Sequence, residues 1–390
     1  MTTALSDAPR RVRILMVTDY FPPHASGGVE HAIYEISRRL VEMGHSVTVL
    51  TLQPHRTTTR ETLEGIEVIR VPGLELSRFF GAQVAVSAHV WAALLRELGA
   101  KRFDIVHVHT LFFHGSLAGA VLTKLRHAPL VTTAHLGSPE DLPGIVGRVT
   151  SVYEATVGRL IINRSARVIA VSNAVAEHLR RLARHPERIE VIPNGVDLER
   201  FTPAATPPSG PPVVLFVGRL IFNKGPQYLV EAMPAIVAKQ PDARFRFAGD
   251  GPMQDELEKR VRELGLAGQV EFLGQREDIP ELLRGATIMA RPSLSEGMPL
   301  VALEAMACGL PVVAADVGGT AEVVQDGVTG YVIEPENAGQ LAERVNRLLG
   351  DATLRHEMGR AARGFVEQGY DWSSIARRTL AVYEAVLATA

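Results

Sequence analysis

The 390-residue sequence contains a single cysteine, Cys308, and no His/Cys spacing typical of a structural zinc site. An internal disulfide is therefore impossible, and a reducing compartment such as the cytosol fits. No apolar run approaches the roughly 20 residues that a membrane-spanning helix needs. The first residues, MTTALSDAPRR, lack the apolar core of a secretion signal, so we expect a cytoplasmic protein.

A strong charge of one sign is also missing, since the formal net charge is −2. Residues 1–203 carry 23 Lys and Arg against 19 Asp and Glu, whereas residues 204–390 carry 18 against 24. The small positive excess of the first half is too weak for a nucleic-acid partner. It would suit an anionic partner or peripheral contact with the inner face of a membrane. The length predicts two domains. The composition is that of an ordinary globular protein.

Strands and helices alternate along the first half. Apolar runs predict strands at 12–18, 46–50, 66–71, 104–109, 130–133, 167–172 and 189–192. Helical spacing predicts helices after Gly28 and at 84–98, 115–125, 148–162 and 174–182. Repeated strand–helix units predict a parallel sheet with helices on both faces, which binds ligands at the carboxyl ends of its strands.

Several polar or glycine residues are expected at that edge of the sheet. Gly27 and Gly28 would let a ligand approach the backbone closely, although a simple turn explains a glycine pair as well. His135 would donate a hydrogen bond to a ligand or titrate, or else bond nearby backbone. His107 and His109 share one face of a strand, and His107 is expected in the core.

The Pro-rich stretch 201–212 predicts a hinge, after which the alternation restarts. Gly218-Arg219 and Lys224-Gly225 follow the next strand, where two cations flanked by glycines are placed to hold phosphate rather than being solvated surface charges. Gly249-Asp250-Gly251 lacks the third glycine of a dinucleotide fingerprint, because Gln254 stands there. This departure counts against a dehydrogenase.

One predicted helix, from Pro299 to about Cys308, is apolar on every side apart from Glu304. A buried carboxylate needs partners, which can be ligand hydroxyls, an Arg or backbone amides. Glu296 precedes this helix, whose start presents free N–H groups at Met298, Leu300 and Val301 to an anion. The arrangement would suit a ligand that carries both phosphate and sugar hydroxyls.

Together these motifs resemble retaining glycosyltransferase family 4. Glu296 and Glu304 match its E-x7-E motif, and the likeness runs from about residue 12 to the end. It includes Gly27-Gly28-Val29-Glu30, Pro193-Asn194-Gly195-Val196-Asp197, Gly218-Arg219, Lys224-Gly225 and Gly249-Asp250-Gly251-Pro252. The family implies an α/β GT-B fold, in which two doubly wound Rossmann-like lobes face each other across a cleft. Residues 1–203 would bind the acceptor, residues 204–369 the nucleotide sugar, and a helix in 370–390 would cross back to the first lobe.

The resemblance also implies roles for single residues. Arg219 and Lys224 would hold the diphosphate, Glu304 the ribose and Glu296 the transferred sugar. His135 would face the donor sugar and join Arg219, Lys224 and Glu296 in catalysis, although Leu136 replaces an Asp that often follows it in the family. The full donor site would comprise Gly27, Gly28, Gly218, Arg219, Lys224, Gly251, Glu296, Gly297, Met298, Pro299, Leu300 and Glu304.

We therefore expect a retaining glycosyltransferase without a metal or other cofactor. It would move a hexose-type sugar from a UDP- or GDP-linked donor to a sugar, lipid-linked or small-molecule acceptor. His109, Phe112 and Asn194 are weaker candidates for acceptor binding, and the aromatics in 78–80 and 111–113 would stack on a sugar or simply pack. Two alternatives share the fold: a nucleotide-sugar epimerase, which would need acid and base groups in the first lobe, and a non-catalytic nucleotide-sugar-binding protein.

Overall fold

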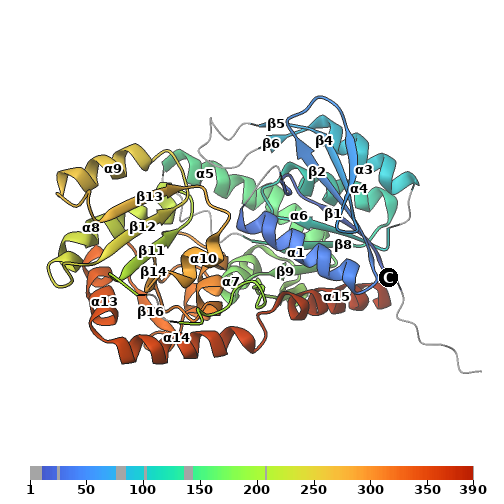
Figure 1. Ribbon diagram of the computed structural model, residues 1–390. Helices are drawn as coiled ribbons and strands as arrows, with labels where there is room; N and C mark the ends of the chain where they lie inside the picture. The colour runs from blue at the N-terminus through green and yellow to red at the C-terminus, as the bar shows by residue number, and fades with distance from the viewer. Residues whose placement is uncertain are drawn as a thin grey trace, which may run out of the picture.

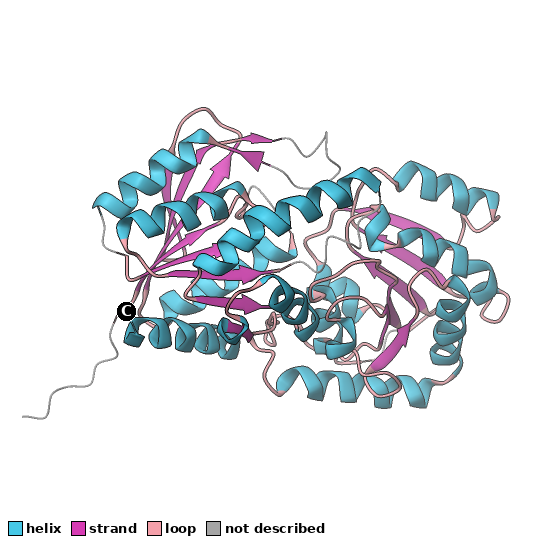
Figure 2. Ribbon diagram, turned by 180° about the vertical axis from the view of Figure 1, so that it is seen from behind, coloured by secondary structure: helices cyan, strands magenta, loops and turns pink. Residues whose placement is uncertain are grey.

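The computed structural model describes residues 11–23, 27–75, 85–100, 103–135, 144–206 and 209–389. The chain forms two α/β lobes, each built on a sheet of mainly parallel strands flanked by helices (Figures 1 and 2). The predicted boundary at residue 203 falls between the last strand of the first sheet and the first strand of the second. Within the described ranges, no helix is both long and apolar enough to cross a bilayer.

The first lobe contains an eight-stranded sheet in the order β10-β9-β8-β7-β1-β2-β4-β3. Its strands are β1 (Arg13–Val17), β2 (Ser46–Gln53), β3 (Thr59–Leu63), β4 (Ile66–Pro72), β7 (Ile105–His109), β8 (Leu130–Ala134), β9 (Arg167–Ala170) and β10 (Ile189–Val191). All pairs are parallel except β3 with β4. Strand β3 was not predicted, because its exposed side chains leave no apolar run to mark it. A separate short pair joins β5 (Leu74–Glu75) to β6 (Ala85–Val86).

The helices of the first lobe connect these strands. They are α1 (Gly28–Glu42), α3 (Ala88–Ala100), α4 (His114–Arg126), α5 (Gly144–Tyr153), α6 (Arg159–Arg164) and α7 (Asn173–Leu182), with a short 3-10 turn at Pro186–Arg188. The single helix predicted at 148–162 is instead α5 and α6 joined by a π-helical segment, Glu154–Gly158. A π-helical turn widens the backbone ring by one residue and often marks a functional site.

The second lobe has a six-stranded parallel sheet in the order β13-β12-β11-β14-β15-β16. Its strands are β11 (Val213–Val217), β12 (Arg244–Ala248), β13 (Val270–Gly274), β14 (Ile288–Arg291), β15 (Val312–Ala315) and β16 (Gly330–Ile333). Its helices are α8 (Pro226–Val237), α9 (Gln254–Glu263), α10 (Ile279–Arg284), α11 (Leu300–Ala307), α12 (Thr320–Val323), α13 (Ala338–Gly350) and α14 (Ala352–Glu367), with a 3-10 turn at Phe222–Lys224. Pro299 was predicted to be the first residue of α11. It is instead the N-cap of that helix, because its ψ of 100° is extended.

The last helix, α15 (Trp372–Thr389), leaves the second lobe and packs on α1 of the first (Figure 1). The crossing begins at a β-bridge between Val196 and Asp371. Trp372 is only 1% exposed, and a Cβ on Gly195 would lie 2.7 Å from its ring. Because no side chain fits between them, Gly195 lets α15 approach the inter-lobe connection closely.

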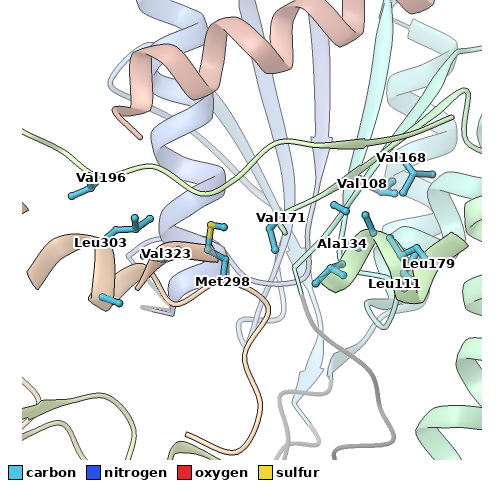
Figure 3. Close-up of a cluster of buried hydrophobic side chains, with 14 of the residues drawn as sticks. Val108, Leu111, Ala134, Val168, Val171, Leu179, Val196, Met298, Leu303 and Val323 are labelled. Atoms are coloured by element: carbon cyan, nitrogen blue, oxygen red, sulfur yellow. The ribbon is translucent and has the colours of Figure 1, made fainter. Parts of the chain in front are cut away.

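A buried apolar cluster also spans the two lobes. Figure 3 shows Met298, Leu303 and Val323 of the second lobe opposite Val171 and Ala134 of the first. Asn194 adds polar contacts, because its backbone N–H lies 3.2 Å from Met298 Sδ and its side-chain amide 3.3 Å from Met298 O. The lobes are therefore in direct contact beside α11.

Candidate functional site

The N-termini of α1 and α11 meet where the two lobes touch. A Cβ on Gly28 would lie 3.1 Å from Leu300 Cδ1, so the first residues of the two helices are in contact. Among the described residues, the N-cap positions Gly27 and Pro299 make no side-chain capping hydrogen bond, and Glu30 lies in the first turn of α1. N–H groups at the start of a helix carry partial positive charge and bind anions. The structure thus brings the predicted residues Gly28 and Leu300 together.

Glu304 lies one turn into α11, and its side chain is partly exposed. Burial raises the pKa of its carboxyl to about 7. No hydrogen bond or ion pair joins this carboxylate to any residue in the described part of the chain. The positive charges of Arg200 and Arg291 oppose this rise in pKa, although neither arginine forms an ion pair with Glu304 among the described residues. The acceptor capacity of Glu304 remains available to a ligand.

Glu296 is buried between two cations. Both of its oxygens lie 3.0 Å from Lys224 Nζ, and Arg291 also pairs with it. Burial alone would raise the pKa of Glu296, but the charges of Arg291 and Lys224 lower it to about 2. Burial in turn lowers the pKa of Lys224, although Glu296 opposes that effect. The structure thus joins two predicted site residues to each other.

Sequence reasoning missed Arg291, which ends β14 and is 6% exposed. Its Nη1 donates to Val217 O at 3.0 Å, at the end of the neighbouring strand β11. The sequence did contain a signal for Arg291. It is an arginine at the end of an apolar strand, five residues before a predicted site carboxylate. Arg291 fixes the loop that carries Glu296, because it bonds the sheet and the carboxylate together.

Arg219 has the opposite environment to Lys224. Its side chain is exposed and forms no hydrogen bond or ion pair with the residues that the structure describes. It follows Gly218, whose φ of 150° is a conformation that other residues rarely adopt. Leu220 N–H donates to Asp250 O at 2.7 Å, and a Cβ on Gly251 would collide with Leu220. Gly218 and Gly251 therefore let two strand-end loops pack tightly and leave Arg219 at their edge.

His135 lies at the end of a row of three buried histidines. His107 and His109 have ring centroids 4.1 Å apart, and His109 and His135 stack at 5.4 Å. His107 accepts or donates hydrogen bonds with Tyr383 OH at 2.6 Å and Thr133 Oγ1 at 2.7 Å, as expected of a core residue. Burial lowers the pKa of His135 to about 4, so this ring is neutral at pH 7.

The predicted acceptor residues lie in different surroundings. His109 is fully buried, and its two ring nitrogens contact His135 and Met16, so the prediction that it touches an acceptor is wrong. Asn194 is 7% exposed and bonds Met298. Phe112 is partly exposed and borders a small cavity beside His135. The aromatic pair in 78–80 and Leu136 lie outside the described residues.

Two further carboxylates near the inter-lobe contact were not predicted as site residues. Glu154, in the π-helical segment, lines the same cavity as His135 and lies 2.8 Å from His178 Nε2. Glu322 of α12 accepts hydrogen bonds from the backbone N–H groups of Asn173 at 2.8 Å and Ala174 at 3.0 Å. It thereby ties the second lobe to the start of α7 in the first. No sequence signal marks either pairing.

Comparison with known proteins places the chain among sugar-transferring enzymes. Residues 26–200 match the family described as Glycosyltransferase Family 4, and residues 199–365 match Glycosyl transferases group 1. A glycogen synthase of Mycobacterium tuberculosis is 31% identical, over 96% of this chain and 95% of the relative.

Solved structures share the fold. The sucrose-phosphate synthase of Thermosynechococcus elongatus superimposes with a TM-score of 0.86 at 24% identity, over 97% of this chain and all of that one. The Anabaena protein HepE, in complex with UDP-glucose, has a TM-score of 0.77 at 23% identity, over 97% and 100% of the two chains. Both likenesses support the two-lobed GT-B architecture described above.

Proposed function

This chain belongs to the family 4 glycosyltransferases of GT-B fold, and we propose that it transfers a hexose-type sugar, with retention and without a metal ion, from a UDP- or GDP-linked donor. The acceptor would be a sugar, a lipid-linked saccharide or a small molecule. The observation that carries the proposal is Glu304, an unpaired carboxylate one turn from the uncapped start of α11. Ribose hydroxyls would satisfy it while the helix start holds the diphosphate.

The cations near α11 would stabilise the leaving group. Arg219 is exposed and without a described partner, and Lys224 Nζ lies 3.0 Å from Glu296. As the bond to the sugar breaks, negative charge grows on the departing diphosphate, and positioned cations and helix N–H groups lower its energy. Glu296 would then contact sugar hydroxyls as a carboxylate, since its pKa is about 2.

We propose that retention arises from attack on the same face that the diphosphate leaves, with a phosphate oxygen taking the acceptor's proton. His135 has a pKa of about 4 and is neutral at pH 7, which suits hydrogen bonding better than proton donation. The competing double displacement needs a nucleophilic carboxylate at the anomeric carbon. Glu154 is the first-lobe carboxylate beside His135, so a glycosyl adduct on Glu154 in mass spectrometry would contradict this mechanism.

The comparisons favour UDP as the first donor to test, because HepE was solved with UDP-glucose. A thermal-shift panel with UDP, GDP, ADP and CMP, first in EDTA and then with magnesium, tests the proposal. A ligand at about a hundred times its dissociation constant stabilises the fold by about 2.7 kcal/mol.

One nucleoside diphosphate should raise the midpoint in EDTA, and that result would identify the base. Absence of any shift would argue against the roles of Arg219, Lys224 and Glu304. A shift that requires magnesium would contradict the metal-free site. Donor epimerised without any acceptor would instead favour the epimerase.

A further inference from the structure

A pocket lies where the chain crosses from the second lobe back to the first. Its volume is about 480 Å³, within the range of pockets that hold small molecules. It is lined by residues 368–370, which join α14 to α15 (Figure 1), by Pro193 in the first connection between the lobes, and by the first two turns of α15. The pocket shares no residue with the site around α11.

The two connections that line the pocket are fixed to each other. Val196 N–H donates to Tyr370 O at 2.7 Å, and Val196 also forms a β-bridge with Asp371. Directly beyond, Gly195 packs against the ring of Trp372. The pocket is therefore formed without a ligand, and a molecule bound in it would contact both connections between the lobes.

Two neighbouring arginines give the pocket a positive charge. Arg377 Nη2 donates to Ser374 Oγ at 2.8 Å, and Arg378 Nη2 donates to Val191 O at 2.7 Å. Both acceptors are uncharged, and neither arginine forms an ion pair with any residue that the structure describes. A guanidinium has five N–H donors. Each arginine is thus positioned by one hydrogen bond and keeps donors and charge for a ligand.

The start of α15 is already capped and adds no free N–H at Ser374. Asp371 Oδ1 accepts from Ser374 N–H at 2.9 Å. Burial opposes ionisation of Asp371, but its bonds with Ser374 and the charge of Arg377 lower its pKa. Asp371 is therefore a carboxylate that caps the helix and does not line the pocket. The affinity for an anion would come from the two arginine side chains.

The donors around the pocket suit a phosphate group. Ser374 and Tyr370 add hydroxyls, and the Tyr370 hydroxyl forms no hydrogen bond in the described part of the chain. A planar carboxylate can be satisfied by one arginine, whereas the oxygens of a phosphate accept from several directions. A phosphomonoester has a second pKa of about 6, so at pH 7 it carries nearly two negative charges, which match two guanidinium groups.

We propose that Tyr370, Ser374, Arg377 and Arg378 bind the phosphate of a small phosphomonoester, such as a sugar phosphate. The volume of the pocket leaves room for an organic group beside the phosphate. This site is separate from the nucleotide-sugar site and does not depend on the proposed function.

Calorimetry with the donor site filled tests the proposal. Inorganic phosphate, glucose 6-phosphate, glucuronate and glucose are titrated into protein saturated with UDP, or with the nucleoside diphosphate that the thermal-shift panel selects. The variants are Arg377→Gln and the double variant Arg377→Gln/Arg378→Gln. Arg180→Gln/Arg181→Gln is the matched control, because it removes the same charge from another adjacent, exposed pair at the end of α7.

We expect glucose 6-phosphate to bind wild type more tightly than glucuronate or glucose does. Arg377→Gln should weaken that binding and the binding of inorganic phosphate about tenfold, and the double variant should weaken both further. The control pair should bind like wild type. Arg377 is exposed and bonds only Ser374, so Arg377→Gln should keep the melting temperature and the test valid if loss of the Arg378 bond to Val191 destabilises the double variant.

The site would be overturned if neither phosphate compound bound, if Arg377→Gln and the double variant bound glucose 6-phosphate like wild type, or if the control pair lost as much affinity. Tighter binding of glucuronate would contradict the phosphate assignment. Wild type that binds no nucleotide would refute only the proposed function, since the same titrations without nucleotide still test this pocket.

Discussion

At the scale of single residues, the site depends on two carboxylates with opposite environments. Glu304 has no described protein partner and a pKa raised by burial to about 7, whereas Glu296 pairs with Lys224 and Arg291 and has a pKa of about 2. An unpaired carboxylate destabilises the folded state and attracts a ligand. A paired one stabilises it. The E-x7-E spacing alone does not distinguish them.

Glu304→Gln should change how stability depends on pH. The folded pKa of Glu304 of about 7 exceeds the unfolded value of 4.5. The protonated carboxyl therefore contributes stability to the folded state below pH 4.5, and this contribution is lost as the pH rises through 7. At pH 8 the variant should be more stable than wild type by on the order of 2 kcal/mol, allowing for the partial exposure of the side chain. Urea unfolding between pH 5 and pH 8 measures the difference.

The buried Asp19, whose pKa burial raises to about 7, titrates in both proteins and cancels from that difference. Glu343→Gln, on an exposed residue of α13, is the matched control and should follow wild type. The Glu304→Gln variant should also lose affinity for the nucleoside diphosphate that the panel selects. Parallel stability curves for wild type and Glu304→Gln would mean that the carboxylate is paired in solution.

Glu296→Gln should destabilise the protein by about 3 kcal/mol at pH 7, because it leaves Arg291 and Lys224 as buried charges without their carboxylate. Because its folded pKa lies below 4.5, this stabilisation is present above pH 4.5 and disappears as pH falls through about 2. Adding Lys224→Met should recover part of the loss. Urea unfolding of the four proteins of this double-mutant cycle measures the coupling, and additive losses would argue against the pairing.

At the scale of elements, helix termini organise the contact between lobes. The N-terminus of α7 is capped twice: Ser172 Oγ accepts from Val175 N–H at 3.2 Å, and Glu322 of the other lobe accepts from Asn173 and Ala174. A carboxylate at a helix N-terminus is also favoured by the helix dipole. A Cβ on Gly319 would lie 2.6 Å from Ser172 Cβ, so only glycine permits this approach.

Glu322→Ala should weaken lobe closure, because the hydrogen bonds by which Glu322 of α12 caps α7 stabilise the contact by about 1 kcal/mol. We expect a larger radius of gyration by small-angle X-ray scattering and a several-fold higher KM for the donor. Glu322→Gln, which keeps one acceptor oxygen, should have a smaller effect. Glu343→Ala serves as the exposed control, and identical scattering curves for all four proteins would count against a role in closure.

At the scale of the whole molecule, α15 connects the end of the chain to the core of the first lobe. Tyr383 is fully buried, and its hydroxyl lies 2.6 Å from His107 Nδ1 in the middle of strand β7. Ile375, Val382 and Val386 of the same helix join the buried cluster that includes Ile14 and Met16 of β1. The first lobe is therefore incomplete without residues that follow the second.

Tyr383→Phe should lower the free energy of unfolding by about 2 kcal/mol, because it leaves a buried histidine nitrogen without its partner. Nucleotide affinity should not change, since the hydroxyl contacts only the core. Tyr331→Phe, in the second lobe, is the matched control, because the Tyr331 hydroxyl forms no hydrogen bond with the described residues. Equal urea stability of the two variants would refute a structural role for this bond.

What the sequence determines by itself is local. Apolar runs and their spacing depend on neighbouring residues, so the alternating strands and helices were predictable. The motifs also led to the correct family and fold. The exposed strand β3 and the π-helical segment were missed, since neither leaves an apolar period.

The tertiary structure alone decides which polar groups pair. Glu322 contacts Asn173 across 149 positions, and Tyr383 contacts His107 across 276. Lys224 meets Glu296, while Glu304 lacks a described partner, although all three carry a charge near the same sheet edge. Such pairings depend on how the helices and sheets of two lobes pack together. No spacing along the chain encodes that packing, because the sequence pattern around each partner predicts the same helix or strand whether or not the other partner is present.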